Sequence, residues 1–343
     1  MRTWFSSPSA RTWTAPGDGA SVRDFHRSLP GYTMTPLVEQ PALAAELRVG
    51  RVLVKDESSR LGLPAFKILG ASWACHQVLL RKPGAELVTA TDGNHGRAVA
   101  RMARYFGVAA TVFVPDVMRP ETAARIAAEG AEVVRLAIGY DATVRAAAAY
   151  AGESDGRALV QDTAWEGYTE VPAWVVEGYR TLLEEVDEQL GGGPDLVAVP
   201  VGVGSLAEAV VRHYRRPGAP RPSVLSVEPD AAGCMLATLS EGKPVTVPTG
   251  FTVMAGLNRG TISSSAWPVL HRGCDAAIAV SDEEARRAVR DLGALGLSSG
   301  PSGAATLAGV RTALADPVRR AALDLPPDSV VVLLSTEGNC ALL

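Results

Sequence analysis

The fold is decided by the stretch LVTATDGNHG, which occupies residues 87–96. The apolar and β-branched residues at 87–90 predict a buried strand, and the turn Asp92–Gly96 joins it to a helix expected over 97–106. The same alternation continues through a strand over 110–115, a helix over 121–129 and a strand over 132–135. This order is typical of a mostly parallel sheet with helical crossovers.

Similar patterns flank this stretch on both sides. They predict strands over 52–55, 196–201, 224–227 and 330–334, and helices over 68–80, 171–190 and 206–214. We therefore expect an α/β protein of two lobes, with mostly parallel sheets and helices on both faces. We place a small mobile lobe at 86–164 and a large cofactor-binding lobe at 1–85 and 165–343.

Composition sets limits on the partners. The chain has 343 residues, of which 47% are hydrophobic and 20% charged, and a net charge of −4, so we expect neither nucleic acid nor an anionic membrane as a partner. No apolar run reaches the roughly 18 residues that a membrane span needs. The N-terminus lacks the apolar stretch of a signal peptide, which favours the cytoplasm. The cysteines (Cys75, Cys234, Cys274 and Cys340) are scattered, so we expect reduced thiols and no metal site, although a disulfide stays open.

The candidate reactive group is Lys67, which lies between an irregular Leu63-Pro64 segment and a predicted helix. A lysine amine can form an imine with an aldehyde cofactor and release it to a substrate amine by exchange. An isolated lysine is usually a solvated surface residue, so this interpretation depends on the motifs that follow it along the chain.

A glycine-rich turn follows the predicted strand over 196–201 and opens the next helix. Its backbone amides can bind a phosphate group, helped by the positive end of the helix dipole. The same residues also fit a dinucleotide fingerprint with Glu228 at the next strand end, as in a dehydrogenase. The turn lies more than halfway along the chain, and a dehydrogenase has no use for Lys67, so we favour the phosphate cradle. The residues of this candidate cradle are Gly202, Val203, Gly204, Ser205 and Leu206.

Two further groups complete the predicted site. The amides of the turn after residue 90 can bind a substrate carboxylate, and Asn94 can donate to a ring hydroxyl; the turn residues concerned are Thr91, Asp92, Gly93, Asn94 and His95. Near the C-terminus, Ser335 or Thr336 can place a neutral hydroxyl against a pyridine nitrogen. Such a hydroxyl leaves the cofactor a weaker electron sink, which favours loss of a β-substituent soon after the α-proton.

These motifs resemble the fold-type II pyridoxal phosphate enzymes, which share the fold of the tryptophan synthase β type, and more narrowly the diaminopropionate ammonia-lyases. The resemblance covers roughly residues 33–339 and uses the motifs already quoted together with VKDESSR at 54–60, AGLN at 255–258 and STEG at 335–338. The segment QDTAWEGY at 161–168 points to the ammonia-lyase branch, because serine and threonine dehydratases lack it.

The resemblance implies pyridoxal 5′-phosphate bound to Lys67, with Asp92 and Asp162 as acid/base groups near the α-carbon and the leaving amine. Plain caps of a helix and of a turn are the competing interpretations of these two aspartates. The implied reaction is α,β-elimination from a small amino acid, first of all 2,3-diaminopropionate, by a cytoplasmic homodimer. A serine/threonine dehydratase or a β-replacement synthase is the alternative in the same fold; a dehydrogenase and an inactive binding protein are alternatives from other classes.

The chain departs from the family pattern at two positions. Arg259 stands where the family tends to have cysteine, and Pro301 stands where it has glutamate. The first change adds a cation and the second removes an anion near the expected substrate mouth. Both would suit a substrate that carries an extra negative group or lacks a second amine, and we therefore include Arg259 among the candidate substrate-binding residues.

Overall fold

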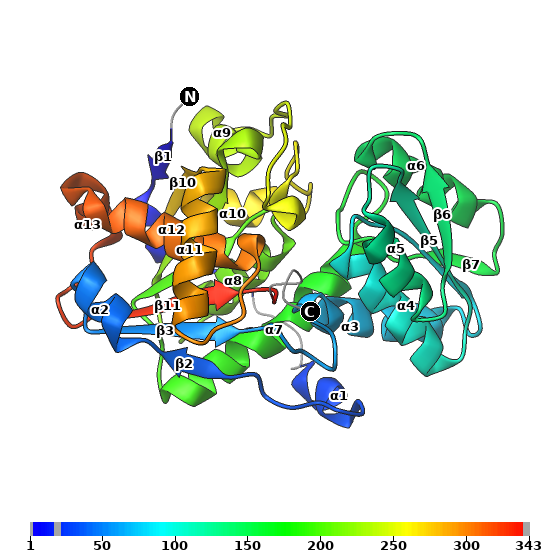
Figure 1. The fold of residues 1–343 in the computed structure, drawn as a ribbon, viewed down its shortest axis with the longest axis horizontal. Coiled ribbons are helices and arrows are strands. Elements are labelled where there is room, and N and C mark those ends of the chain that lie inside the picture. The colour runs from blue at the N-terminus through cyan, green and yellow to red at the C-terminus, as the bar shows by residue number, and fades with distance from the viewer. Residues whose placement is uncertain (1–2, 17–21, 339–343) are drawn as a thin grey trace.

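The computed structural model describes residues 3–16 and 22–338, and it contains two lobes that lie side by side (Figure 1). The large lobe is built on a seven-stranded sheet of order β1-β10-β9-β8-β11-β3-β2, and the small lobe on a four-stranded sheet of order β6-β5-β4-β7. Every strand pair is parallel except β1 with β10 and β2 with β3, which are antiparallel. The expected α/β class with mostly parallel sheets is confirmed.

The strands are β1 Trp4–Ser6, β2 Leu37–Glu39, β3 Arg51–Asp56, β4 Glu86–Ala90, β5 Ala110–Pro115, β6 Glu132–Leu136, β7 Arg157–Leu159, β8 Leu196–Pro200, β9 Ser223–Pro229, β10 Ala276–Val280 and β11 Val330–Ser335. The α-helices are α1 Arg23–Ser28, α2 Pro41–Leu47, α3 Lys67–Arg81, α4 Asn94–Phe106, α5 Pro120–Ala127, α6 Tyr140–Gly152, α7 Glu170–Leu190, α8 Ser205–Arg215, α9 Cys234–Glu241, α10 Trp267–Gly273, α11 Asp282–Ala294, α12 Pro301–Ala315 and α13 Pro317–Leu323. Short 3₁₀ helices are η1 Pro8–Thr12, η2 Asp230–Ala232 and η3 Ala255–Leu257. Each strand and helix predicted from the sequence is present, with ends that differ by a few residues.

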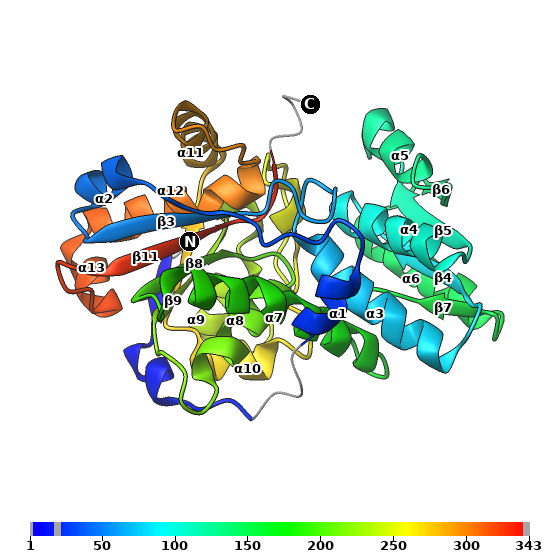
Figure 2. The ribbon, with the colours of Figure 1, turned by 90° about the horizontal axis from the view of Figure 1, so that it is seen from below.

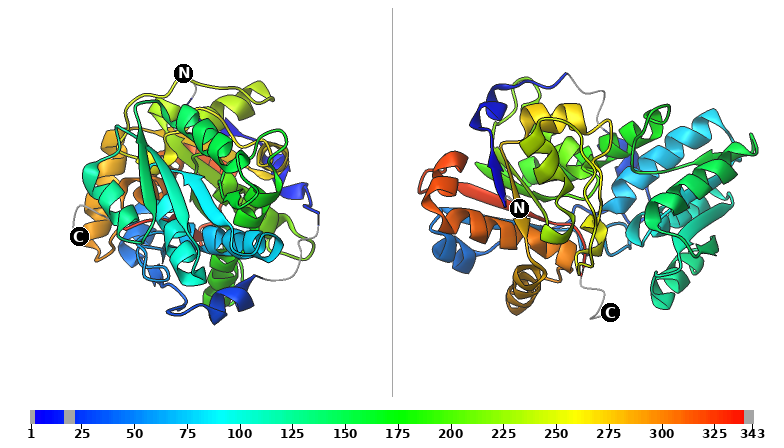
Figure 3. Two further views of the ribbon diagram at one scale, coloured as in Figure 1. Left: turned by 90° about the vertical axis from the view of Figure 1, so that its right-hand side faces the viewer. Right: turned by 90° about the horizontal axis from the view of Figure 1, so that it is seen from above.

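Helices cover both faces of each sheet. In the large lobe α11 and α12 lie over one face, and α7, α8 and α10 lie over the other (Figure 2). In the small lobe the alternation of side chains along a strand assigns the faces: Leu87 and Val112 pack in the core cluster that includes α3 and α4, whereas Val88 and Phe113 pack in the cluster that includes α6. Figure 3 shows the molecule from the side of the small lobe and from above.

The sheet order brings distant chain segments to one edge. Strands β3 and β11 are neighbours and run toward the small lobe (Figure 1). Strands β8 and β11 are also parallel neighbours, so the turns that follow them open on the same side of the large lobe. In open α/β sheets ligands bind beyond the carboxyl ends of the strands, and the predicted motifs lie at the ends of β4, β8 and β11.

A buried charge cluster joins the first part of the chain to α7. Lys55 Nζ lies 2.8 Å from Glu185 Oε2, and Arg60 lies 2.6 Å from Glu57 and 2.7 Å from Glu185. None of these four side chains is exposed, and each charge has an opposite partner, as a buried charge requires. Residues 54–60 of the sequence motif therefore serve to hold the chain that leads into Lys67.

Helices α3 and α7 cross at two glycines, and this contact positions the helix that begins with Lys67. A Cβ atom on Gly178 would lie 2.5 Å from the carbonyl oxygen of Leu69, and one on Gly70 would lie 2.7 Å from the carbonyl oxygen of Val175. Backbone atoms cannot move aside as a side chain can, so only glycine permits this approach.

Replacing Gly178 with alanine is expected to lower the free energy of unfolding by about 1–3 kcal/mol, because the new methyl group overpacks a backbone contact. Chemical denaturation measures the change. Gly192→Ala is the matched control, since no heavy atom lies within 4 Å of a Cβ built there, and it should change stability by less than about 0.5 kcal/mol. Equal stability of the two variants would contradict the close helix contact.

Candidate functional site

Lys67 is the first residue of α3, and its amine reaches a buried acid. The chain enters the helix through an antiparallel bridge between Ala65 and Glu337, which places the start of α3 beside the residues that follow β11. Its Nζ donates a hydrogen bond to Asp162 Oδ2 at 2.6 Å. The Lys67 side chain is 21% exposed and that of Asp162 only 8%. Burial opposes both charges, but their mutual attraction outweighs it, raising the pKa of Lys67 and lowering the pKa of Asp162.

Both lobes fix the position of Asp162. The residue follows β7, and its backbone carbonyl accepts a 2.7 Å hydrogen bond from the Ser205 hydroxyl at the start of α8. The preceding side chain, Gln161, accepts hydrogen bonds from Thr89 Oγ1 and the Ala90 amide of β4. Asp162 is therefore held between the cradle turn of the large lobe and the central strands of the small lobe.

The turn after β4 is stabilised by the Thr91 hydroxyl. Thr91 Oγ1 accepts hydrogen bonds from the amides of Gly93 and Gly96, at 3.0 and 3.1 Å. Asn94 opens α4 and its side-chain amide donates to Glu337 Oε2 at 2.9 Å. The other oxygen of Glu337 accepts from the Ser302 amide at 3.2 Å, and burial raises the pKa of this carboxyl. The predicted ring-hydroxyl donor thus lies beside the end of β11.

The cradle turn after β8 has backbone geometry that glycine alone adopts easily. Gly204 has a φ of +97°, and a Cβ there would lie 3.0 Å from Leu270 Cδ1. A Cβ on Gly202 would lie 2.9 Å from the carbonyl oxygen of Gly256. Val203 accepts the Ser263 amide through its carbonyl, and the Leu206 side chain is buried. The turn thus brings bare backbone to the N-terminus of α8, where amides can approach a phosphate.

The dinucleotide interpretation of this turn is wrong, because Glu228 has another use. Its carboxylate accepts hydrogen bonds from the amides of Met235 and Leu236, at 2.9 and 2.6 Å, in the first turn of α9. Glu228 is 1% exposed, so it caps a helix inside the core and cannot reach the hydroxyls of a ribose. Burial raises its pKa to about 8.

The two hydroxyls at the end of β11 have different surroundings. Ser335 Oγ donates to Ser299 Oγ at 2.7 Å, which ties it to the chain before α12. The Thr336 carbonyl accepts the Phe66 amide at 3.1 Å, one residue before Lys67. Both residues are buried.

Asp92 meets Arg259 across the two lobes. The guanidinium binds both carboxylate oxygens, at 2.9 and 2.8 Å, and lies 4.0 Å from the centre of the Tyr140 ring. The Arg259 side chain is 12% exposed; burial opposes its charge, but Asp92 outweighs this and raises the pKa of Arg259. Asp92 lies near the site as predicted, but its carboxylate is turned to Arg259.

His95 lies in the first turn of α4 and is 5% exposed. Its Nε2 donates to the Val160 carbonyl at 2.9 Å, and its Nδ1 lies 4.0 Å from Asp162 Oδ2. The ring therefore faces the Lys67–Asp162 pair. Burial lowers the pKa of His95, so the ring is neutral at pH 7.

Sequence reasoning missed three residues around this site: Glu337, Tyr140 and Tyr179. Tyr179 of α7 lies with its ring 4.7 Å from that of Phe66, and burial raises its pKa to about 12. Glu337 had a signal, since it directly follows the two hydroxyl residues and is the acid of its motif. The two tyrosines had none, because neither belongs to a motif that the sequence singles out.

The residues fit the expected cofactor. A glycine-only turn at a helix N-terminus offers a phosphate cradle, and Ser205 links that turn to Asp162. Lys67 supplies an amine at the carboxyl ends of the strands, and Asn94 supplies a side-chain donor. No cluster of metal-binding side chains is present in residues 3–16 and 22–338, and no described helix is long and apolar enough to cross a membrane. Cys75, Cys234 and Cys274 are buried free thiols, and Cys340 lies outside the described residues.

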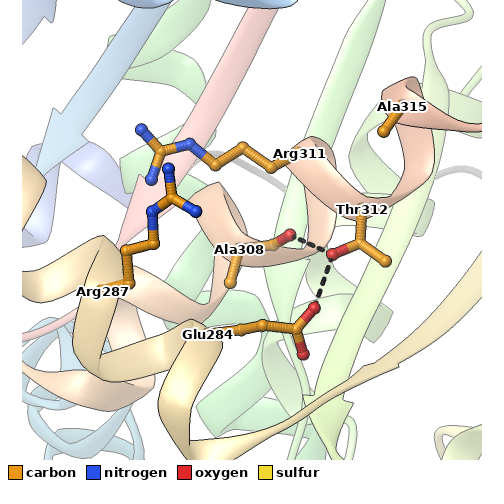
Figure 4. A pocket seen from close by; sticks show the side chains of 6 residues that line it. All are labelled: Glu284, Arg287, Ala308, Arg311, Thr312 and Ala315. Carbon is orange, nitrogen blue, oxygen red and sulfur yellow. Dashed lines mark hydrogen bonds between the residues drawn. The ribbon is translucent and has the colours of Figure 1, made fainter.

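Other hollows lie away from this site. One, of about 330 Å³, lies between α11 and α12, where the Thr312 hydroxyl donates to Glu284 and to the Ala308 carbonyl (Figure 4). Glu284 also closes the capping box of α11 with Ser281. These polar groups already serve the two helices, and none of the predicted site residues lines this hollow.

Comparisons with known proteins agree with the geometry. Residues 29–337 match the family described as "Pyridoxal-phosphate dependent enzyme". The chain is 35% identical over 349 residues to the diaminopropionate ammonia-lyase of Escherichia coli, covering 93% of this chain and 87% of that protein. It is 32% identical over 331 residues to an L-threonine dehydratase of Mycobacterium leprae, covering 94% and 71%.

A solved structure gives the same result. The crystal structure of the Escherichia coli diaminopropionate ammonia-lyase in complex with an aminoacrylate–PLP azomethine reaction intermediate matches with a TM-score of 0.85. The two chains are 36% identical, with 92% of this chain and 87% of that chain covered. The chain therefore belongs to the pyridoxal-phosphate-dependent enzymes of fold type II, on the branch of the diaminopropionate ammonia-lyases.

Proposed function

We propose that the chain eliminates ammonia from 2,3-diaminopropionate, giving pyruvate and a second ammonia after hydrolysis of the product. The cofactor and the carbon–nitrogen lyase class follow from the family. The observation that carries the proposal is the 2.6 Å contact between Lys67 Nζ and Asp162 Oδ2. It joins the amine expected to hold the cofactor to a buried acid, which is what proton transfer at the α-carbon and at a leaving amine requires.

Residues of both lobes are expected to bind the cofactor and the substrate. The Gly202–Leu206 turn would hold the phosphate of the cofactor, Asn94 would donate to its ring hydroxyl, and Ser335 or Thr336 would face its ring nitrogen. When bound, pyridoxal phosphate supplies an electron sink for the pair released at the α-carbon. The amides of the Thr91–His95 turn, at the N-terminus of α4, hold the substrate carboxylate.

Asp162 is the proposed acid/base group beside the leaving amine. While Lys67 carries its positive charge at 2.6 Å, Asp162 stays ionised. Once that charge is gone, the burial of Asp162 favours its protonated form, and the carboxyl can give a proton to the departing amine. The β-amino group leaves readily only when it is protonated, because it can then depart as neutral ammonia. This proton transfer therefore accelerates the elimination step.

The position of Arg259 favours a second candidate function, the dehydration of serine or threonine. A bidentate guanidinium neutralises Asp92 and lies beside the proposed carboxylate-binding turn. A substrate with a second ammonium group gains less from a neutralised Asp92 than from a free one. A dehydratase acting on serine or threonine needs no such partner, so this pair supports dehydration as the alternative.

We further propose that the small lobe, 86–164, moves against the large lobe during turnover, and that the chain acts as a cytoplasmic homodimer. The Asp92–Arg259 contact supports the first proposal, since it links the two lobes by side chains alone. The homodimer rests on the family resemblance, and the cytoplasmic location on the free thiols of Cys75, Cys234 and Cys274.

Lys67→Ala is expected to abolish the visible absorbance that lysine-bound pyridoxal phosphate gives, because the amine that binds the aldehyde is gone. Lys82→Ala is the matched control, since Lys82 is exposed beyond the other end of α3 and should keep the band. Retention of the band in Lys67→Ala would refute the cofactor assignment.

Asp162→Asn is expected to slow elimination by about 10²–10⁴-fold, because the amide neither accepts nor returns the proton. Asp92→Asn should also slow elimination. The two variants should differ in which enantiomer of the substrate, D or L, is affected more. Pyruvate and ammonia released from each enantiomer are measured together. Near wild-type rates in both variants would remove these aspartates from the mechanism.

Arg259→Ala is expected to change the ratio of activities on 2,3-diaminopropionate and serine by about tenfold or more, since it uncovers the Asp92 charge. Cofactor content, read from absorbance, should stay constant and serves as the internal control. An unchanged activity profile across D- and L-amino acids would place Arg259 outside substrate selection.

A further inference from the structure

One nitrogen of His95 has no hydrogen-bond partner in the described part of the chain. The Nε2 donates to the Val160 carbonyl, which fixes the tautomer, since a carbonyl oxygen can only accept. The Nδ1 atom therefore carries a lone pair. It is buried, forms no hydrogen bond with a described residue, and lies 4.0 Å from Asp162 Oδ2. A shift of about 1 Å would bring the two atoms to hydrogen-bond distance.

The Lys67–Asp162 pair requires a further proton acceptor. Lys67 is an ammonium in this pair, and an ammonium has no lone pair with which to attack an aldehyde. One proton must leave Nζ before the cofactor can be captured. Asp162 Oδ2 is the nearest acceptor, but bulk water has little access to it because its side chain is only 8% exposed. The Nδ1 of His95, which belongs to the small lobe like Asp162 itself, faces the same carboxylate oxygen that Lys67 contacts from the large lobe.

We propose that His95 is a proton relay that takes the Lys67 proton through Asp162 and so frees the lysine amine to capture its cofactor. The Nζ–H bond breaks as an O–H bond forms on Asp162, and that O–H bond breaks as an N–H bond forms on His95 Nδ1. The ring becomes an imidazolium that still donates to Val160, and no oxidant or reductant takes part. This inference rests on the proposed role of Lys67.

The surrounding charges change in the direction that the relay needs. The titratable groups that face the ring are Asp162 from the loop after β7, Lys67 from α3 and Asp92 from the turn before α4. Burial lowers the pKa of His95, Asp162 raises it and the Lys67 charge lowers it. When Lys67 gives up its proton, the last of these effects disappears, so His95 becomes a better acceptor at that moment.

The test measures the rate at which the full-length chain, stripped of cofactor, captures added pyridoxal 5′-phosphate. For the wild type, the rate at which visible absorbance rises in stopped flow should vary little between pH 7 and 9, because an internal base takes the Lys67 proton. A rate that climbs tenfold per pH unit would mean that hydroxide takes the Lys67 proton directly, and would overturn the relay without any mutant.

His95→Gln sharpens the test, because the amide can still donate to the Val160 carbonyl but cannot accept the proton at neutral pH. Capture at pH 7 should slow by about 10²-fold, and the difference should close as pH rises. Wild-type rates at pH 7, or a loss that is the same at every pH, would overturn the relay and leave His95 a positioning residue at most. Loss of the band itself in Lys67→Ala, by contrast, tests only the cofactor assignment.

His213→Gln is the matched control. His213 is also buried with an Nδ1 that lacks a hydrogen-bond partner in the described part of the chain, and its Nε2 contacts Asp187 at 2.7 Å away from the site. This variant should capture the cofactor at the wild-type rate. Melting temperatures of both variants verify that each is folded before its rate is compared.

Discussion

The contact between Lys67 and Asp162 is the interaction on which the site depends. The two residues are 95 positions apart, and one begins α3 while the other follows β7. Two opposite charges with little access to water are stable only as a pair, so the fold must deliver both to the same place. The pairing also matters for the charges, because each keeps the other group ionised as long as Lys67 holds its proton.

Close backbone packing delivers these residues. The approach of α3 to α7 through Gly70 and Gly178 sets where α3 begins, and the Ser205 hydroxyl fixes the carbonyl of Asp162. The same Ser205 opens α8 after the glycine turn. A shift of the glycine turn is therefore passed directly to the backbone of Asp162.

The Asp92–Arg259 pair distinguishes this chain from the pattern of its family. Arg259 lies on the large lobe, while Asp92 and Tyr140 belong to the small one, so the guanidinium joins the two lobes. A planar guanidinium that binds a carboxylate with two hydrogen bonds and stacks on a ring cannot be replaced by lysine without loss of geometry. One side chain thus links the two lobes.

The sequence by itself determined the α/β class, the parallel strands and the glycine turn after β8, because strand periodicity and glycine turns are local properties. It also marked Lys67 and Asn94 as candidate site residues, and the family resemblance added Asp162. The sequence did not reveal that Glu228 caps α9, that Arg259 binds Asp92, that the Nδ1 of His95 faces Asp162, or that Glu337 accepts a hydrogen bond from Asn94. Those facts depend on which side chains meet across long loops and between two lobes. Only the tertiary structure decides them, since a local pattern carries no information on the partner of a buried charge.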